Sequence, residues 1–260
     1  MRARLRTMEP FSRALITGAS SGLGREIAVQ LAKSGTEVVL MARRGNLLEE
    51  VAAEIRAGGG RAHTEVLDVT DVERAQSAVR EWDSRLGGFD LVLANAGLGE
   101  AAHSRELEWA AIDRVLQTNI RGALAILHAA TGPMLERGTG TLAGMSSLAA
   151  LRGMPASGAY SASKAALSTY LETLRIDLRG SGVKVVDIRP GFVHTPMTAG
   201  ADHPLPFVID VERGARYSIR GLERGQSVVA FPWKIAWSLG ALALLPNSLW
   251  DFVASRISRD

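Results

Sequence analysis

The sequence predicts an α/β fold, a doubly wound parallel sheet in a single domain with helices on both faces. Short apolar runs alternate with amphipathic helical patterns, the order that parallel strands with crossover helices require. A glycine-rich loop separates the first predicted strand from the first predicted helix. Polar residues stand where several apolar runs end. Since parallel strands end at one edge of their sheet, we expect these residues to form the functional site there.

The first predicted unit is a strand, a loop, a helix and a second strand. Residues 12–17 predict the first strand, residues 17–24 (TGASSGLG) the loop, residues 25–33 a helix ending at Gly35, and residues 37–41 the second strand. Glycines allow a tight turn and close backbone approach to a pyrophosphate, which then lies at the helix N-terminus. The glycine spacing differs from the GxGxxG motif, so the position of the loop between strand and helix carries the prediction of a dinucleotide site.

Two arginines follow the second strand. In dinucleotide sites an acidic residue at this strand end binds the ribose hydroxyls and would repel a 2′-phosphate. Here Arg43 and Arg44 stand at that edge, and a guanidinium makes bidentate, charge-assisted bonds to phosphate. The pair favours NADP(H). The alternative is a solvated basic loop in a chain whose 30 basic residues include only four lysines.

The alternation of strands and helices continues to residue 188. Helical patterns cover residues 46–57, 72–86, 106–130 and 156–178, and strands are predicted at residues 61–67, 90–94, 139–145 and 183–188. Thr70 or Asp71 is the predicted N-cap of the helix at residues 72–86. The residues placed at the carboxyl ends of the strands are Thr17, Gly18, Arg43, Asp68, Asn95, Ser147, Pro190 and Gly191.

The helix at residues 156–178 carries Tyr160 and Lys164 four residues apart, so both project from one face. A neighbouring ammonium favours phenolate and lowers the pKa of a tyrosine from its usual value near ~10. Such a phenol exchanges a proton with a hydroxyl or ketone oxygen. The pair by itself has low specificity, because this spacing also occurs by chance.

Taken in order, these motifs resemble those of the short-chain dehydrogenase/reductase family over about 180 residues, from Thr17 to Met197. The resemblance implies a Rossmann-like fold and an NADP-preferring oxidoreductase of standard length. Ala94 and Gly144 depart from the family pattern, which often has an asparagine and a polar residue there. The matching motifs are TGxxxGxG, Asp68, NAG at residues 95–97, Asn119, Ser147 thirteen residues before Tyr160, Lys164, and PGxxxTP at residues 190–196.

The resemblance implies a role for each catalytic residue. Tyr160 is the general acid in reduction and the general base in oxidation, and Lys164 lowers the pKa of Tyr160 and binds the nicotinamide ribose. Ser147 holds the substrate oxygen, Asn119 orients Lys164 through a water and continues the proton relay, and Ser146 is a structural neighbour.

The resemblance also implies a cofactor site, in which Asp68 contacts the adenine and Thr195 the carboxamide. Its expected residues are Gly18, Ser20, Ser21, Gly22, Leu23, Gly24, Arg43, Arg44, Asp68, Val69, Asn95, Ala96, Gly97, Tyr160, Lys164, Pro190, Gly191, Val193 and Thr195.

The predicted function is NADP(H)-dependent interconversion of a ketone or aldehyde and an alcohol on a small, lipophilic substrate. One alternative is a catalytically silent dinucleotide-binding scaffold or redox sensor on the same fold. The intact set of Asn119, Ser147, Tyr160 and Lys164 argues against that alternative. A lyase, epimerase or dehydratase of the related extended group is a further alternative, which the short C-terminal part disfavours.

The chain loses its alternation beyond residue 192. Residues 194–207 contain three prolines and predict an irregular segment beside the active site, followed by a helix at residues 211–224 and a strand at residues 226–231. Residues 233–253 are apolar on most sides and interrupted by Pro246. We expect them to pack on the protein's own core or on a partner subunit. Bordering an apolar substrate pocket is a second interpretation, and contact with a membrane surface is a third that the sparse basic face disfavours.

Composition and charge exclude several other classes of protein. A net charge of +3 from 30 basic and 27 acidic residues is mixed and does not suggest nucleic acid. The absence of cysteine excludes disulfides and thiolate metal sites, and the five scattered histidines predict no metal site. The sequence therefore predicts a cytoplasmic protein.

The predicted organisation has three parts: a flexible arm at residues 1–10, a cofactor-binding and catalytic core at residues 11–191, and a substrate-loop and apolar segment at residues 192–260. We expect no signal peptide and no membrane-spanning run. By resemblance, we expect a homodimer or homotetramer formed through the helices at residues 106–130 and 160–178.

Overall fold

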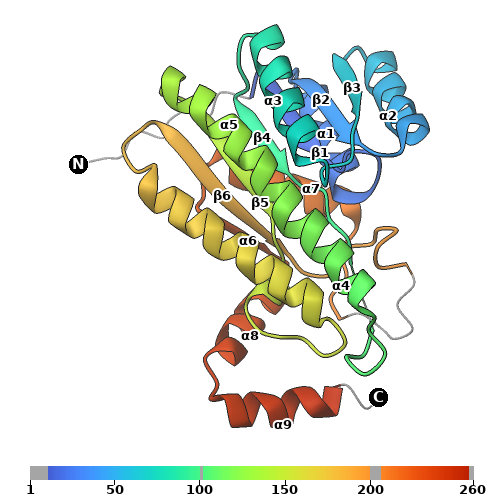
Figure 1. The fold of residues 1–260 in the computed structure, drawn as a ribbon, viewed down its shortest axis with the longest axis vertical. Helices are drawn as coiled ribbons and strands as arrows, with labels where there is room; N and C mark the ends of the chain where they lie inside the picture. Colours follow the sequence, from blue (N-terminus) through green and yellow to red (C-terminus); the bar gives the residue numbers. More distant parts are fainter. Residues whose placement is uncertain (1–10, 100–101, 200–205, 258–260) are drawn as a thin grey trace.

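A computed structural model describes residues 11–99, 102–199 and 206–257, so the arm predicted at residues 1–10 lies outside the described residues. Within the described parts, seven parallel strands form one sheet in the order β3-β2-β1-β4-β5-β6-β7, with helices on both faces (Figure 1). The predicted doubly wound sheet is confirmed. The order reverses between β1 and β4, which is where ligands bind in such sheets.

The strands and helices follow one another through the described chain. The strands are β1 (Arg13–Thr17), β2 (Glu37–Ala42), β3 (Ala62–Val66), β4 (Leu91–Ala94), β5 (Gly140–Met145), β6 (Val183–Pro190) and β7 (Val228–Phe231). The α-helices are α1 (Gly22–Lys33), α2 (Gly45–Ala57), α3 (Val72–Leu86), α4 (Trp109–Leu116), α5 (Ala123–Arg137), α6 (Gly158–Asp177), α7 (Val211–Glu223), α8 (Trp233–Ala243) and α9 (Asn247–Ile257). A π-helix, η1 (Gln117–Gly122), joins α4 to α5, and a short 3₁₀ turn, η2 (Leu148–Ala150), follows β5.

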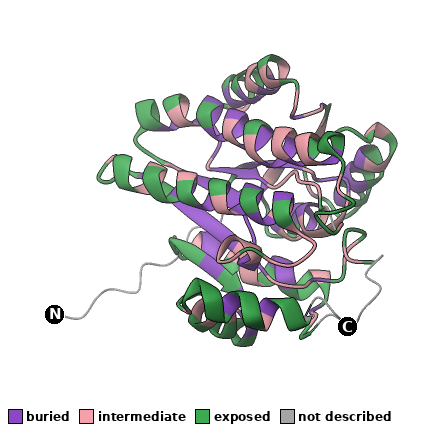
Figure 2. Ribbon diagram, turned by 60° about the horizontal axis from the view of Figure 1, so that its bottom comes forward, coloured by how far each residue is buried: buried purple, intermediate pink, exposed green. Residues whose placement is uncertain are grey.

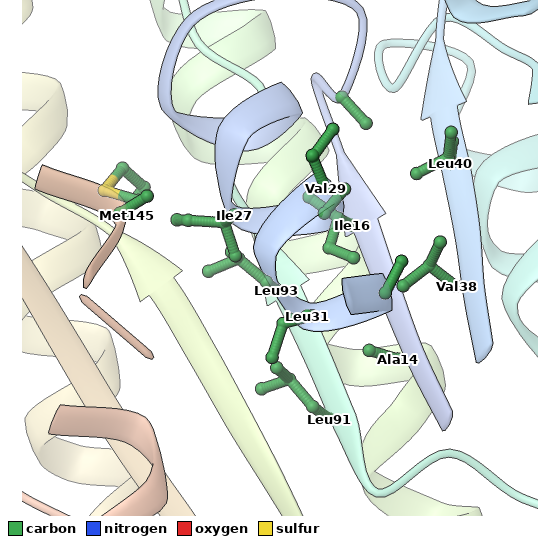
Figure 3. Packing of buried hydrophobic residues seen from close by; sticks show 14 of the residues in the cluster. Ala14, Ile16, Ile27, Val29, Leu31, Val38, Leu40, Leu91, Leu93 and Met145 are labelled. Carbon is green, nitrogen blue, oxygen red and sulfur yellow. The ribbon is translucent and has the colours of Figure 1, made fainter. Parts of the chain in front are cut away.

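The sheet is buried on both faces, which explains the continuous apolar runs of its strands. Helices α1, α2 and α7 pack on one face and α3, α5 and α6 on the other. Because strand side chains alternate in direction, Ile16 packs with Ile27 under α1, whereas its neighbour Leu15 packs on the opposite face. Figure 3 shows the first of these two cores between α1 and the sheet.

The single helix expected at residues 106–130 is wrong in three respects. It begins later and is divided by η1, whose last residue, Gly122, lies against Val69: a Cβ on Gly122 would be 2.6 Å from Val69 Cγ2. It also continues through Pro133, although proline removes a helical hydrogen bond, and the next residue, Met134, is completely buried. The other predicted elements are found with shifted ends, including α1, which begins at Gly22 instead of Arg25. Asp71 is the N-cap of α3, accepting from Arg74 N at 3.1 Å.

The C-terminal segment forms two helices separated at Pro246, and its packing on the chain's own core, one of the two partners that we expected, is partial. Trp250 and Ile235 are buried, but Trp233 and Trp237 are 72% and 76% exposed. Figure 2 shows the exposed surface of these helices. The segment is therefore only partly packed on its own core. No helix in the described ranges is both long and apolar enough to span a bilayer.

Candidate active site

The glycine loop turns tightly between β1 and α1 and lies against the end of β4. Gly18 has a φ of +67°, and a Cβ there would lie 2.8 Å from Ala96 Cα. A Cβ on Gly24 would lie 2.3 Å from Asn95 Nδ2. Side chains at these two positions would push the loop away from the strand. The N-cap of α1, Ser21, makes no side-chain capping bond, so the backbone N–H groups of the first turn are available to an anion.

Thr17 and Asn95 fix the geometry of this loop. The Thr17 hydroxyl accepts from the backbone N–H groups of Asn95 and Ala96, at 3.0 Å each. Asn95 Nδ2 donates to the Thr17 carbonyl at 2.8 Å. These bonds connect the end of β1 to the NAG motif after β4. Asn95 therefore holds the start of the glycine loop in place through the Thr17 backbone.

Arg43 and Arg44 lie in different environments. Arg44 Nη2 donates to the hydroxyls of Ser20 and Ser21, at 2.9 and 2.7 Å, and so lies on the glycine loop. Arg43 is also exposed, and its Nη1 lies 3.5 Å from Asp68 Oδ2. Burial opposes ionisation of Asp68, but hydrogen bonds from Thr70 and the Arg43 charge outweigh it and lower the pKa of the carboxyl.

Asn119 lies in the π-helix and is fully buried. Its Oδ1 accepts from Leu98 N at 2.7 Å, and its Nδ2 donates to Leu98 O at 2.9 Å and to Ser163 Oγ at 3.0 Å. Asn119 therefore fixes the loop after β4 relative to α6. π-Turns of this kind occur frequently at functional sites.

Gly97 brings three predicted site residues together. A Cβ on Gly97 would lie 3.2 Å from Asn119 Oδ1 and 3.3 Å from Lys164 Nζ. These residues come from the end of β4, from η1 and from α6. A side chain at this position would therefore press against both the amide and the ammonium.

Lys164 and Tyr160 project from the same face of α6, as expected. Lys164 is buried, its Nζ donates to the Met145 carbonyl at 2.8 Å, and it lies 5.6 Å from the centre of the Tyr160 ring. Burial lowers the pKa of Lys164 to about 8, partly offset by the negative charge of Asp187.

The sequence-based expectation that Lys164 lowers the pKa of Tyr160 is wrong for the protein without a ligand. Desolvation raises the pKa of Tyr160, and the hydrogen bond with Ser147 only partly opposes it. The Lys164 ammonium donates to a backbone carbonyl, and burial disfavours its own charged form. Its charge therefore does not overcome the desolvation of the phenol.

Ser147 lies at the carboxyl end of β5 and is buried. Its hydroxyl accepts from Ala149 N at 3.1 Å and lies 3.4 Å from the Pro190 carbonyl. The strand ends of β5 and β6 thus position this hydroxyl beside Tyr160.

The remaining predicted residues lie around the same edge, with two exceptions that point inward. Thr195 comes close to the glycine loop, since a Cβ on Gly22 would be 3.4 Å from its Cγ2. Leu23 packs toward α7 and Val69 toward η1, so both serve packing. Val193 is buried and pairs with Ile209, while Gly191 N donates to Phe231 O at 2.7 Å.

Sequence analysis missed the polar residues behind this site. Asp187 in β6 is buried and accepts from Ser146 and Ser168, and Arg189 Nε lies 2.7 Å from its Oδ2. The available signal was a charged residue within the apolar run VKVVDI. In the described parts of the chain, no group of three or more histidine, aspartate or glutamate side chains is arranged to hold a metal.

Comparisons with known proteins match this chain over most of its length. Residues 12–205 match the family model described as short chain dehydrogenase. An uncharacterized oxidoreductase from Myxococcus xanthus is 43% identical over 244 residues, covering 94% of this chain and 96% of that protein.

Two solved structures share the fold. A short-chain dehydrogenase from Sphingobium yanoikuyae in complex with NADPH has a TM-score of 0.80 and 26% identity, with 95% of this chain and 96% of that chain covered. A short-chain dehydrogenase from Mycobacterium paratuberculosis bound to NAD has a TM-score of 0.77 and 24% identity, over 86% of this chain and 95% of that chain. The match over most of the chain, together with the shared arrangement of loop, strands and helices, shows that the protein belongs to the short-chain dehydrogenase/reductase family of oxidoreductases.

Proposed function

We propose that the protein is an NADP(H)-dependent oxidoreductase that interconverts a ketone or aldehyde and an alcohol, with Tyr160 as the general acid and base. The observation that carries this proposal is the Ser147 hydroxyl beside the Tyr160 phenol, with the Lys164 ammonium 5.6 Å from the centre of the Tyr160 ring. All three groups lie at the sheet edge that carries the glycine loop. A proton donor beside a second hydroxyl is what a carbonyl oxygen needs as it gains negative charge.

The residues present fit a phosphorylated dinucleotide. The uncapped start of α1 offers backbone N–H groups to a pyrophosphate, and its first turn carries no acidic residue. Arg44 lies on the loop that contains that start, and no acid follows β2. When bound, the nicotinamide supplies or accepts the hydride, and the protein supplies position and charge.

Side chains of the protein donate and accept the proton of the reaction. With a raised pKa, the Tyr160 phenol is protonated at neutral pH and is ready to donate to a carbonyl oxygen. Ser147 holds that oxygen, and the Lys164 charge favours the phenolate left behind. Asn119 keeps the Leu98 loop and Ser163 in place beside Lys164, so that the relay has a fixed geometry.

The preference for NADP(H) over NAD(H) rests on the two arginines. The Sphingobium yanoikuyae neighbour holds NADPH, while the Mycobacterium paratuberculosis neighbour of similar fold holds NAD. Arg44 already donates two hydrogen bonds on the glycine loop, and Arg43 reaches Asp68 from the exposed side. A 2′-phosphate between them would accept from both guanidinium groups.

The test is a fluorescence titration of the protein with NADPH and with NADH, for wild type, Arg43→Ala and Arg44→Ala. Loss of a charge-assisted bond corresponds to about a 10- to 100-fold weaker affinity for NADPH with little change for NADH. Arg61→Ala is the matched control, because Arg61 is an exposed arginine at the opposite edge of the sheet, 3.5 Å from Glu37. Equal affinities for both nucleotides would contradict the NADP(H) preference, and binding of neither would contradict both the proposed cofactor site and the dinucleotide-binding scaffold alternative.

The substrate we propose is lipophilic. Met197, from the segment after β6, lies beside the loop after β4, since a Cβ on Gly99 would be 3.1 Å from its Cγ. Met197 is 54% exposed and offers an apolar surface next to the site. Aliphatic ketones of increasing length should therefore gain about fourfold in kcat/KM per methylene, from ~0.8 kcal/mol for each buried CH₂. Best activity on short, charged carbonyls would contradict this substrate class.

A homo-oligomer remains our expectation for the assembly. On the helices expected to pair, Trp109 of α4 is 71% exposed and Ile176 of α6 is 64% exposed. Apolar side chains of this size favour burial against a second copy. Light scattering after gel filtration measures the mass, and a monomer at micromolar concentration would contradict the expectation.

A further inference from the structure

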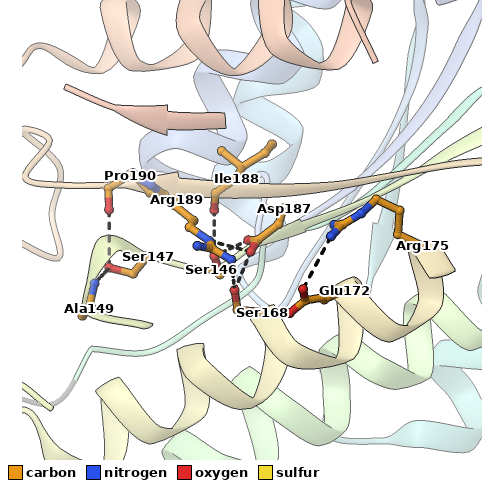
Figure 4. A network of polar contacts seen from close by, with 10 residues as sticks. All are labelled: Ser146, Ser147, Ala149, Ser168, Glu172, Arg175, Asp187, Ile188, Arg189 and Pro190. Carbon is orange, nitrogen blue, oxygen red and sulfur yellow. Dashed lines mark hydrogen bonds and ion pairs between the residues drawn. The ribbon is translucent and has the colours of Figure 1, made fainter. Parts of the chain in front are cut away.

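A buried carboxylate lies directly behind the proposed catalytic residues. Asp187 is 1% exposed, and the hydroxyls of Ser146 and Ser168 both donate to it (Figure 4). Arg189 completes the cluster: its Nε lies 2.7 Å from Asp187 Oδ2, and its Nη2 donates to Ser168 Oγ at 2.7 Å. Every oxygen of the carboxylate is thus engaged.

Fold stability alone does not explain this cluster. Val183 and Val185 precede Asp187 on the same side of β6 and pack in the apolar core beneath α6. An apolar residue at the next inward position would continue that core, and replacing a buried ion pair by apolar residues is often neutral or stabilising. Packing therefore does not explain why a charged residue, Asp187, stands at this position.

The two serines connect Asp187 to the catalytic residues. Ser146 directly precedes Ser147 at the end of β5, and Ser168 is one helical turn beyond Lys164 on α6. One carboxylate therefore bridges the strand end that carries Ser147 and the helix that carries Tyr160 and Lys164.

The backbone reinforces this bridge. The Met145 carbonyl, which accepts from Lys164 Nζ at 2.8 Å, belongs to the residue paired with Ile188, the neighbour of Asp187. Ser146 N donates to the Ile188 carbonyl at 2.8 Å. The position of Lys164 is thus set by the same strand pair that Asp187 ties to α6.

We propose that Asp187 is a positioning residue of the active site, which holds β5 and α6 in register and keeps a negative charge facing Lys164. The role assigned to Lys164 in catalysis rests on the proposed function. The contacts of Asp187 and its effect on Lys164 are independent of that function.

The electrostatics around Lys164 support this role. Several elements packed against α6 carry charged residues: Asp113 and Arg114 of α4, Arg121 of η1, and Lys184, Asp187 and Arg189 of β6. On α6 itself, the titratable residue nearest to Lys164 in the site is Tyr160. Of these, Asp187 raises the pKa of Lys164 against the larger lowering by burial. Without that carboxylate, the buried lysine would lose its proton at lower pH.

The test measures Lys164 directly, in the full chain and without substrate. The protein has only four lysines, so ε-¹³C-lysine labelling gives four NMR signals, and Lys164→Met identifies the one that belongs to Lys164. In Asp187→Asn, which keeps the size of the side chain, the midpoint of the Lys164 titration should fall by about one pH unit. An unchanged or raised midpoint in a folded variant would overturn the proposal.

A second variant separates charge from loosened structure and remains informative if Asp187→Asn does not fold. Arg189→Gln removes the cation that competes for Asp187, so the Lys164 midpoint should rise. A structural disturbance alone would move both variants in the same direction, and a fall or no change in Arg189→Gln would overturn the proposal.

Asp83→Asn is the matched control. Asp83 is also a buried aspartate paired with an arginine, Arg137, at 2.7 Å, but it accepts from Phe89 N at the amino edge of the sheet. It should change stability and leave the Lys164 midpoint unchanged. Opposite shifts in the two β6 variants, in a protein that reduces no carbonyl, would support the role of Asp187 and overturn the proposed function.

Discussion

Two regions of the molecule differ in which side chains they bury. One is the edge of the sheet at the active site, and the other consists of the C-terminal helices α8 and α9. At the edge, even polar groups are buried, and Asn119, Ser147 and Lys164 each make specific hydrogen bonds. In α8 and directly after it, large apolar groups such as Trp237 and Leu244 are 76% and 87% exposed. The usual relation between polarity and burial is thus reversed in both regions.

This difference separates two kinds of function. Buried polar groups are expensive unless every one is paired, and they have perturbed pKa values, which suits proton chemistry. Exposed apolar groups are free to contact something outside the chain or a lipophilic ligand. Hydrogen bonds from Arg152 connect the two regions: this residue donates to Ala243 O at 3.3 Å and to Asn247 Oδ1 at 2.9 Å. Away from this contact, we expect mutations in one region to leave the other largely unaffected.

The largest expected effect is that of Tyr160→Phe. Removing the phenolic hydroxyl takes away the proton donor and leaves the ring in place, so turnover of a ketone should fall by about 10³-fold. NADPH affinity, measured by fluorescence, should change little. Tyr170→Phe is the control, because Tyr170 is partly exposed and lies on the same helix but outside the site. A Tyr160→Phe enzyme with normal turnover would show that the buried edge has another role.

The next effect compares two tryptophans of the C-terminal segment. Trp250 is 6% exposed and lies under the Arg152 guanidinium, so Trp250→Ala should lower the free energy of unfolding by about 3 kcal/mol. Trp237→Ala, at an exposed position, should change it by less than about 0.5 kcal/mol. Urea denaturation at two protein concentrations measures both. A large loss for Trp237→Ala that depends on concentration would mean that this face is buried between copies.

A smaller effect distinguishes two glycines that both lie within helices. Gly24→Ala should lower the free energy of unfolding by about 2 kcal/mol and weaken NADPH binding, because its Cβ would clash with Asn95 Nδ2. Gly132→Ala in α5 meets nothing within 4 Å and should raise stability by about 0.5 kcal/mol. Thermal melts with and without NADPH give both numbers. Equal destabilisation by the two substitutions would show that the glycine loop is not tightly packed.

The smallest effect is the pH dependence that Lys164 contributes to stability. Its pKa in the folded protein, about 8, lies below the ordinary 10.5, so between these values the unfolded chain binds more protons. Stability therefore rises with pH in this window, by about 1 kcal/mol between pH 8 and 9. The difference between wild type and Lys164→Met in urea midpoints isolates this contribution. A difference that stays constant or falls over this range would contradict the burial cost of the ammonium.

The sequence by itself determined the strands, the helices and the sheet edge. Apolar runs with a period of two or 3.6 residues depend on neighbours a few positions away, and so does the Tyr160–Lys164 pair. For the same reason the glycine loop and the two arginines after β2 were found without any structure. These features are local, and local features are readable from a single chain.

Other features were decided only by the tertiary structure. The π-helix that contains Asn119 ends where Gly122 meets Val69, more than fifty positions earlier in the chain, and α5 continues through Pro133 into the buried Met134. The contacts of Arg44 with Ser20 and Ser21 likewise join separate elements. No pattern within a short window contains these neighbours.

The charge state of the site shows the same limit most clearly. Spacing placed Lys164 one turn from Tyr160, and the sequence therefore predicted a lowered pKa for the phenol. The fold instead buries Lys164, desolvates the Tyr160 phenol so that its pKa rises, and places Asp187 behind Lys164. Sequence spacing determined which groups meet, whereas desolvation, which depends on every segment that excludes water from them, decided how strongly each holds its proton.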